Sequence, residues 1–221
     1  MSRMKTLARI GTTLALILGL ASSASADSFL TSVSTKSKTA ARVAPEPYTG
    51  STIQAKNVVP RALQTIKSTR NAAIGLDVIQ RVDGQAMDNP KLAGSFGRGL
   101  AKLSRSGDPV YTVLRGANLA RRNPDSDRAA AMVRKAARQA PNDSAVQLVA
   151  GLALAQREAF GKDGGAQWET ATKGKREAAK LINKAQELEA KTIHPRPLVR
   201  EGIKEAKEYA GYYAGYNGLI K

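Results

Sequence analysis

Large apolar residues recur every three or four positions along much of the chain from residue 91 onward. Leu92, Phe96 and Leu100 are followed by Leu103, so these four residues fall on one side of a helix. Short segments rich in proline, asparagine and aspartate interrupt the pattern, as helix ends do. The pattern predicts helices over 91–106, 109–122, 125–140, 144–160, 175–191 and 198–216. We therefore expect an all-α protein of antiparallel helical hairpins, stacked as a short repeat-like solenoid or a bundle.

Residues typical of helix starts support these boundaries. Asp108 is a good N-cap, and Pro109 is a favoured first residue of a helix. Ser144, followed three residues later by Gln147, resembles a capping box that opens the helix over 144–160. The Gly-rich segment 161–174 is expected to be a loop.

Residues 60–82 are harder to assign. Pro60 is suited to the first position of a helix, and apolar residues follow at close to helical spacing. The alternating, β-branched run from Ile74 to Val78 favours a strand instead, and Gly75 weakens a helix by about 1 kcal/mol relative to alanine. We favour a helix over 60–82. A short strand over 51–59 stays open.

The first 26 residues have the three parts of a secretory signal peptide. Three cations, Arg3, Lys5 and Arg9, precede the apolar run 10–20, and Ala24–Ser25–Ala26 gives a small-x-small cleavage site. The apolar run is too short to cross a bilayer, which needs about 20 residues. We expect cleavage after Ala26, a periplasmic or secreted mature protein, and no membrane-spanning segment after processing. An uncleaved anchor is the alternative.

The rest of the chain divides by composition. Residues 27–59 are rich in serine and threonine and poor in large apolar side chains, so they are expected to form a flexible leader. Residues 60–221 are expected to form one helical domain. Within it we expect a repeat-like core over 108–191 and a C-terminal capping helix over 198–216.

Small residues follow the facing sides of the predicted helices in a repeating order. The positions expected to pack helix against helix are Ala117, Ala129, Ala136, Gly151, Ala178 and Ala185. Over about residues 110–190 this order resembles the tetratricopeptide repeat and the similar Sel1-like repeat, in which small residues lie where two helices cross. Gly116 and Ala120 depart from that family, which has leucine and an aromatic residue there. The resemblance implies a stacked helical surface that binds a partner protein, and an unrelated helical bundle is the alternative.

The chain is strongly basic. Its formal charge is +17, and the segment 91–142 alone holds 11 Lys and Arg against 3 Asp and Glu. A chain this basic attracts anions, and in an exported protein an acidic glycan or lipid is more accessible than nucleic acid. The candidate anion-binding residues are Arg98, Lys102, Arg105, Arg121 and Arg122. An ordinary solvated face would have the same composition.

Aromatic residues give a second set of candidates. Tyrosines recur with a four-residue period near the C-terminus, and the only tryptophan lies in the 161–174 loop. Such rings are enriched at protein interfaces. The candidate partner-binding residues are Trp168, Tyr209, Tyr212, Tyr213 and Tyr216. The alternatives are that the tryptophan holds the loop onto the core and that the tyrosine helix docks on the helix over 175–191.

Residues for catalysis or metal binding are sparse. The chain has no cysteine and one histidine, His194 in a helix break. Glu158, Asp163 and Glu169 are close in sequence, but spacing through a loop does not fix the distances that acid–base chemistry requires. We expect no catalytic residue, no metal and no cofactor. The sequence therefore predicts an exported, non-enzymatic scaffold of the cell envelope that binds another protein, or alternatively a cationic protein that binds an anionic envelope polymer, lipid or glycan.

Overall fold

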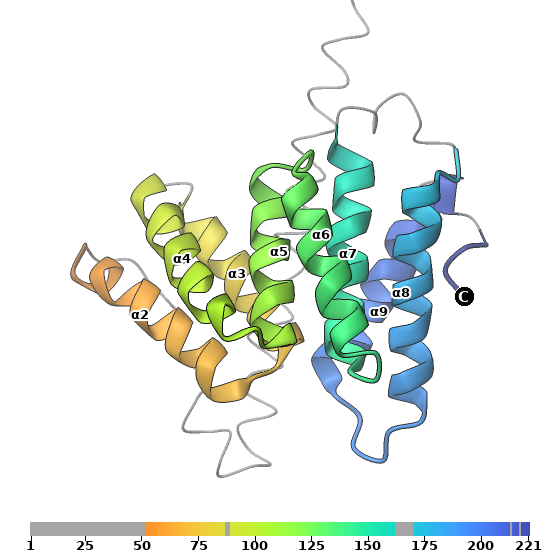
Figure 1. Ribbon diagram of the computed structural model, residues 1–221, viewed down its shortest axis with the longest axis horizontal. Helices are drawn as coiled ribbons and strands as arrows, with labels where there is room; N and C mark the ends of the chain where they lie inside the picture. Colours follow the sequence, from red (N-terminus) through yellow and green to blue (C-terminus); the bar gives the residue numbers. More distant parts are fainter. Residues whose placement is uncertain (1–51, 87–88, 162–169, 213, 217) are drawn as a thin grey trace, which may run out of the picture. The chain divides into compact units, whose positions relative to one another are not determined.

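Figure 1 shows the chain as a computed structural model, which describes residues 52–86, 89–161, 170–212, 214–216 and 218–221. The chain divides into two compact units, Met1–Val58 and Val59–Lys221. In the first unit the described residues belong to the beginning of α2 (Thr52–Thr69), which continues into the second unit. The expected signal peptide over 1–26 and most of the expected leader lie outside the described residues.

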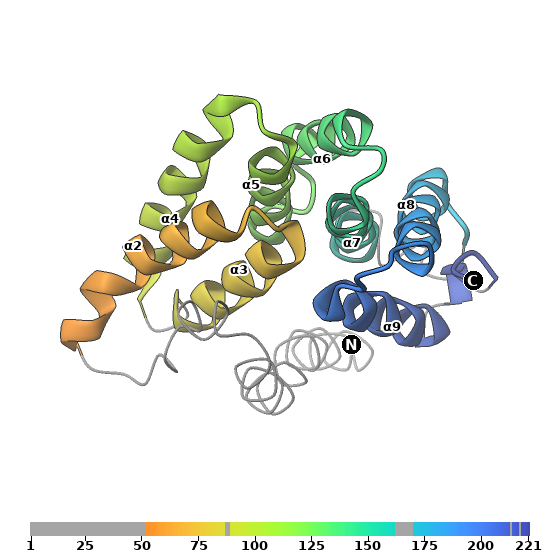
Figure 2. The same ribbon diagram turned by 90° about the horizontal axis from the view of Figure 1, so that it is seen from below.

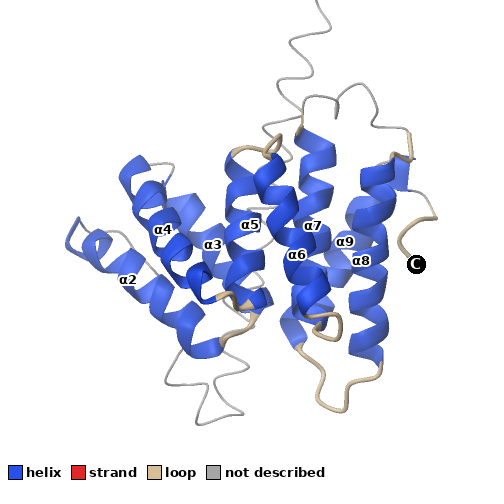
Figure 3. Cartoon of the chain, viewed as in Figure 1, coloured by secondary structure: helices blue, strands red, loops and turns tan. Residues whose placement is uncertain are grey.

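Every regular element in the described part of the chain is helical (Figure 3). After α2 follow α3 (Ala72–Ala86), α4 (Pro90–Leu103), the 3₁₀ turn η1 (Ser104–Ser106), α5 (Pro109–Arg122), α6 (Asp127–Gln139), α7 (Ser144–Phe160), α8 (Lys173–Ala190), α9 (Pro197–Tyr212) and the 3₁₀ turn η2 (Ala214–Tyr216). The prediction of an all-α protein is confirmed. Among the described helices, none has the length and apolar character that crossing a bilayer requires.

Three antiparallel hairpins organise the second unit. They are α3 with α4, α5 with α6, and α7 with α8, and the closest packing is between α7 and α8. Helix α9 then lies against both α7 and α8 (Figure 2). Helix α3 contacts α5 and also α7 and α9, so one side of the two later hairpins is packed against a helix of the same unit.

The region 60–82 forms two helices where one was expected. Pro60 lies inside α2, which begins at Thr52, so the strand considered for 51–59 is wrong and the leader cannot extend to residue 59. The helix ends because Arg70 adopts a positive φ of 44°. Asn71 then starts α3, since its side-chain oxygen accepts hydrogen bonds from the backbone N–H groups of Ala73 at 2.9 Å and Ile74 at 3.3 Å.

The predicted helix starts are right at α5 and shifted at α7. Asp108 caps α5 by accepting from Val110 N–H at 2.9 Å, and Pro109 is the first helical residue. At α7 the cap is Asp143, whose carboxylate accepts from Ala145 N–H at 2.9 Å. The expected capping box of Ser144 and Gln147 is therefore wrong. Both side chains are buried inside the protein, where they bind groups of other helices.

The helix crossings depend on two glycines. A Cβ atom added at Gly151 of α7 would lie 2.7 Å from Ile182 Cγ1 and 3.0 Å from the carbonyl oxygen of Ala178 in α8. A Cβ atom added at Gly116 of α5 would lie 2.6 Å from Val133 Cγ1 and 3.2 Å from the carbonyl oxygen of Ala129 in α6. The two helices within each hairpin thus cross in the same way in both hairpins.

This crossing corrects the predicted register by one residue. Gly116, which departs from the repeat pattern, is the counterpart of Gly151, whereas the repeat pattern puts the small residue of α5 one position later, at Ala117. All six residues expected at helix contacts are nevertheless buried, as expected: Ala117, Ala129, Ala136, Gly151, Ala178 and Ala185.

Candidate anion-binding cleft

An open cleft of about 570 Å³ lies between the helices α6 and α8. Four of its lining side chains are cationic and one is anionic: Arg134 from α6, and Lys173, Arg176, Glu177 and Lys180 from α8. We call this the α6/α8 cleft, and we call Lys173, Arg176 and Lys180 the α8 cations. A cleft with this composition attracts anions.

Arg134 and Glu177 form a two-pronged ion pair at the cleft. Arg134 Nε donates to both carboxylate oxygens, at 2.8 and 3.0 Å, and Arg134 Nη2 donates to Oε2 at 2.7 Å. This hydrogen-bonded carboxylate raises the pKa of the Arg134 guanidinium. The pair links α6 to α8, and it leaves the three α8 cations as the unbalanced charge of the cleft.

The α8 cations are exposed and have no ion-pair partner among the described residues. Two of them, Lys173 and Arg176, lie in the first turn of α8, which contains no acidic residue. Helix N-termini carry a partial positive charge, so cations are disfavoured there by about 0.3–1 kcal/mol each. The protein already places one anion at this helix end, because the Glu158 carboxylate accepts from the N-cap residue Thr172 at 2.5 Å and lies beside Gly174.

A third cation in the same turn, Lys175, is used inside the protein. Only 3% of it is exposed. Its amine donates to the Thr170 carbonyl at 2.9 Å and lies 5.8 Å from the centre of the Tyr216 ring. Burial lowers the pKa of Lys175, while the nearby Glu158 carboxylate opposes that shift. Lys175 thus helps to fix the C-terminal turn η2 against the start of α8.

The structure spreads the predicted anion-binding residues over several places. Arg98 and Lys102 are exposed on α4, and Arg105 is exposed on η1, beyond the end of that helix. Arg121 Nε donates to Asp83 Oδ2 at 2.7 Å and so is engaged in an ion pair. Arg122 reaches back towards α4, where its Nη1 lies 3.2 Å from the position of a Cβ added at Gly97. The five residues thus belong to three different elements, and one of them is already paired with a carboxylate.

Like charges do gather near Arg105. Burial, together with the positive charges of Arg128 and Arg105, lowers the pKa of the Arg115 guanidinium. Arg115 Nη1 also donates to Ser104 Oγ at 3.0 Å. Cations from α5, α6 and η1 therefore share one basic region.

Most of the predicted aromatic surface cannot be placed. Trp168 and Tyr213 lie outside the described residues, and so do the side chains of Tyr209 and Tyr212. Tyr216 is described, and only 1% of it is exposed. Since α9 ends at Tyr212 and residues 214–216 form a 3₁₀ turn, Tyr212 and Tyr216 do not lie on one helical line as expected. The prediction that Tyr216 offers a partner-binding surface is wrong, because its ring is buried.

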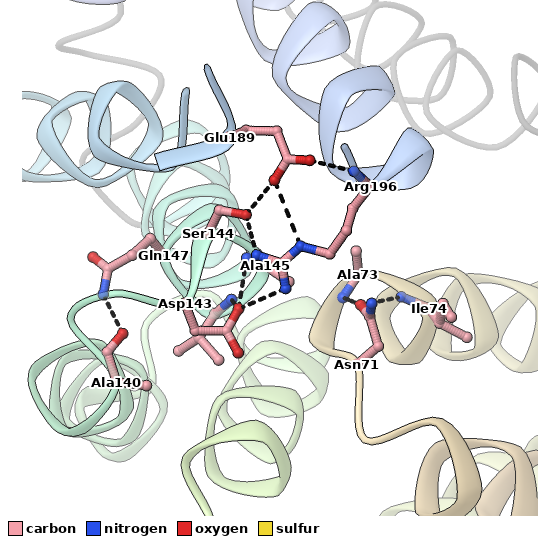
Figure 4. A network of polar contacts seen from close by, with 11 residues as sticks. Asn71, Ala73, Ile74, Ala140, Asp143, Ser144, Ala145, Gln147, Glu189 and Arg196 are labelled. Atoms are coloured by element: carbon pink, nitrogen blue, oxygen red, sulfur yellow. Dashed lines mark hydrogen bonds and ion pairs between the residues drawn. The ribbon is translucent and has the colours of Figure 1, made fainter. Parts of the chain in front are cut away.

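A second polar cluster joins three helices near the other end of α8 (Figure 4). The buried Glu189 accepts from Ser144 Oγ at 2.6 Å and from the backbone N–H of Arg196. The Arg196 guanidinium lies 3.5 Å from Glu189 Oε2 and donates to Asp143 Oδ1 at 3.1 Å. This cluster fastens the start of α7 and the segment before α9 to the end of α8, and we read it as structural.

Gln147 completes this part of the structure. Its amide nitrogen donates to the carbonyl oxygens of Ala137 at 2.8 Å and Ala140 at 2.9 Å. These carbonyls lie at the end of α6, where backbone acceptors lack helical partners. Within the described residues, no group of three or more His, Cys, Asp and Glu side chains is placed to hold a metal ion.

Sequence reasoning missed the α8 cations. Arg134 counted only as one cation of the basic segment 91–142, and nothing in the sequence connected it with a helix that begins 39 positions later. The available signal was the run Lys173–Gly174–Lys175–Arg176 at a helix start that contains no acidic residue. That run identifies an unusual helix start but not the helix that faces it.

The fold and the cleft define an all-α protein of stacked hairpins with a basic cleft between two of its helices. Compared with known proteins, the chain matches no family model, no curated protein and no solved structure.

Proposed function

We propose that this protein is an exported, non-enzymatic helical module that holds an anionic partner of the cell envelope by charge. The observation that carries the proposal is the α6/α8 cleft, where three exposed cations stand against a single carboxylate that is already paired with Arg134. Of the two functions considered from sequence, this geometry favours charge-driven binding.

The overall charge supports the same proposal. The formal charge of +17 attracts an acidic polymer or surface from a distance, which accelerates encounter. The basic region around Arg105, Arg115 and Arg128 adds to that attraction. Binding of this kind depends on ionic strength, since exposed charges are screened over about 8 Å at physiological salt.

A protein-binding scaffold remains the second candidate, and the repeated helix crossing favours it. Gly116 against Val133 and Gly151 against Ile182 are equivalent contacts in successive hairpins, as a tetratricopeptide-like array would have. However, α3 packs against the first helix of both hairpins, α5 and α7, so that side of the two hairpins is already occupied within the protein. We therefore place the scaffold second.

Salt separates the two candidates. Envelope extract is passed over the immobilised full-length chain, and the bound material is washed at low salt and at about 0.5 M NaCl. Charge-driven binding predicts that an acidic polymer or lipid is released by the salt wash. Retention of a protein partner through that wash, with no acidic polymer bound at low salt, would favour the scaffold.

Export is tested separately. The chain is produced in a bacterial host, and the N-terminus of the product in the periplasm or the medium is sequenced. We expect a product that starts at Asp27, because cleavage follows Ala26. A product that stays in the cytoplasm with its first 26 residues intact would contradict this part of the proposal.

A further inference from the structure

Building on the proposed function, we infer that the α6/α8 cleft binds a segment of a linear, phosphate-bearing polymer that lies along α8. The inference deepens the proposed function, because it names both the site and the chemical class of the ligand. It depends on the position of the α8 cations, on their surroundings and on the shape of the cleft.

The α8 cations form a row. Lys173, Arg176 and Lys180 are separated by three and four positions, and all three line the same cleft. With a rise of 1.5 Å per residue, they are spaced by about 4.5 and about 6 Å along the helix axis. A ligand that neutralises all of them must therefore carry several negative charges over about 10 Å.

Phosphate is the group that best fits this row. The one carboxylate in the cleft, Glu177, already occupies the guanidinium of Arg134. Arg176 has a planar fork of donors that matches phosphate oxygens, and the two lysines act as mobile point charges on either side. Because the Glu158 carboxylate already binds the N-cap residue Thr172, the phosphates would be held by the exposed side chains of the row.

The size of the cleft favours a polymer over a single ion. Its volume of about 570 Å³ is that of a site for a ligand of many atoms, so one phosphate would leave most of it filled with water. The cleft is also open to solvent along its described lining, so it does not enclose a small ion.

Other anionic partners fit less well. A flat membrane surface would meet the outermost side chains first, and none of the cleft residues is a large apolar side chain that could enter a bilayer. Single-stranded nucleic acid normally stacks its bases on aromatic rings, and none of the described residues that line the cleft is aromatic. A phosphate-bearing backbone without bases is the simplest match.

The test uses the full-length chain and a linear inorganic polyphosphate as the probe. One variant replaces the α8 cations (Lys173→Gln, Arg176→Gln and Lys180→Gln), and a matched variant replaces three exposed cations of α4 and η1 (Arg98→Gln, Lys102→Gln and Arg105→Gln). Both variants lose the same charge from exposed positions. We expect the first to weaken polyphosphate binding about 30-fold at low salt and the second only about threefold.

A variant that is expected to strengthen binding still tests the inference if the triple variants fold poorly. Glu177→Gln removes the carboxylate from the cleft and frees Arg134, so it should tighten polyphosphate binding about threefold to tenfold. Glu187→Gln removes an exposed charge from the same helix, outside the cleft, and should change polyphosphate affinity by no more than about twofold. Circular dichroism of each variant checks that the helices are retained.

The possible outcomes separate the inference from the proposed function. Equal losses in both triple variants, with no gain from Glu177→Gln, would overturn the cleft as the site while leaving charge-driven binding intact. If, in addition, the unaltered chain binds acidic lipid vesicles more tightly than polyphosphate, the assignment of a phosphate polymer as the ligand would also be wrong. If the unaltered chain binds neither probe at low salt, both the inference and the proposed function fail.

Discussion

The hairpins α5/α6 and α7/α8 have the same kind of helix crossing but differ in the charges at the start of their second helices. In both, a glycine of the first helix lies against the backbone of the second, at Gly116 and at Gly151. Helix α6 then begins with Asp127, an acid that suits a helix start, whereas α8 begins with Lys173, Lys175 and Arg176.

The glycine crossings, which the two hairpins have in common, serve folding, and we expect the charges at the start of α8, which differ, to serve binding. The crossings require small residues because two backbones approach closely, and this requirement is met in the same way in both hairpins. The exposed charges of Lys173 and Arg176 contribute nothing to that packing. A cluster of exposed charges that the packing does not require is where we expect function.

The largest effect should come from filling the crossings. Gly116→Leu and Gly151→Leu each place a side chain where even a single carbon atom would overlap Val133 or Ile182, so each should destabilise the protein by about 3 kcal/mol or more. Gly84→Leu on α3 is the control, because nothing lies within 4 Å of a Cβ added there.

Urea unfolding of the three variants gives the free energies. If the two crossings are equivalent, Gly116→Leu and Gly151→Leu should lose similar amounts, and Gly84→Leu should be neutral or gain up to about 1 kcal/mol of helix propensity. A tolerated Gly116→Leu beside a damaging Gly151→Leu would show that the two hairpins are not built alike.

A somewhat smaller loss should follow from the cluster that only the second hairpin has. Glu189→Ala leaves the Ser144 hydroxyl and the Arg196 backbone N–H without their acceptor, and the Arg196 guanidinium keeps only the Asp143 carboxylate. This should cost about 3 kcal/mol or somewhat less, since the Arg196 side chain is 35% exposed. Glu187→Ala, two positions earlier and exposed, is the matched control.

Hydrogen exchange locates this loss. Because the cluster fastens the start of α9, Glu189→Ala should raise exchange of the α9 amides more than that of α5 and α6. An equal rise in all the helices would mean that the cluster supports the whole unit and not the junction of α8 and α9.

The smallest effect is a change of slope at alkaline pH. Burial, with a further contribution from Glu158, raises the pKa of the Tyr216 hydroxyl above its ordinary value of 10.0. The unfolded chain therefore loses this proton first, and stability falls as pH rises above about 10. Tyr216→Phe should remove that fall.

The comparison must be made between the two proteins at each pH. Lys175, whose pKa is lowered by burial, has the opposite sign: its contribution makes stability rise with pH towards 10.5, in both proteins. Urea unfolding from about pH 9 to about pH 11 measures the difference in slope. Parallel curves for the two proteins would show that Tyr216 titrates alike in the folded and unfolded chains.

Much of the fold could be predicted from local signals. Asp108 followed by Pro109 marked the start of α5 correctly, and the apolar spacing from Leu92 to Leu100 marked α4. These features depend only on neighbours in the chain. The break at Arg70 was missed because the apolar spacing continues across it. Asn71 caps α3 through a contact with Ala73 only two positions later, which the longer apolar pattern does not reveal.

The candidate site could not be predicted, for a related reason. Ser144 and Gln147 matched a local motif, but their partners Glu189 and Ala137 are set by how the helices pack. Arg134 and Glu177 are 43 positions apart and meet only after α6 and α8 have both packed against α7. Charge on a helix face is visible in the sequence, whereas the cleft it lines is a product of tertiary packing.

Lysine footprinting tests the central claim most directly. The full-length chain is acetylated at low salt with and without linear polyphosphate, and labelling at each lysine is read by mass spectrometry. The account predicts that polyphosphate protects Lys173 and Lys180, which line the α6/α8 cleft, and leaves the exposed Lys91 and Lys102 of α4 labelled as before. Equal protection of all four lysines, or protection of Lys91 and Lys102 alone, would contradict it.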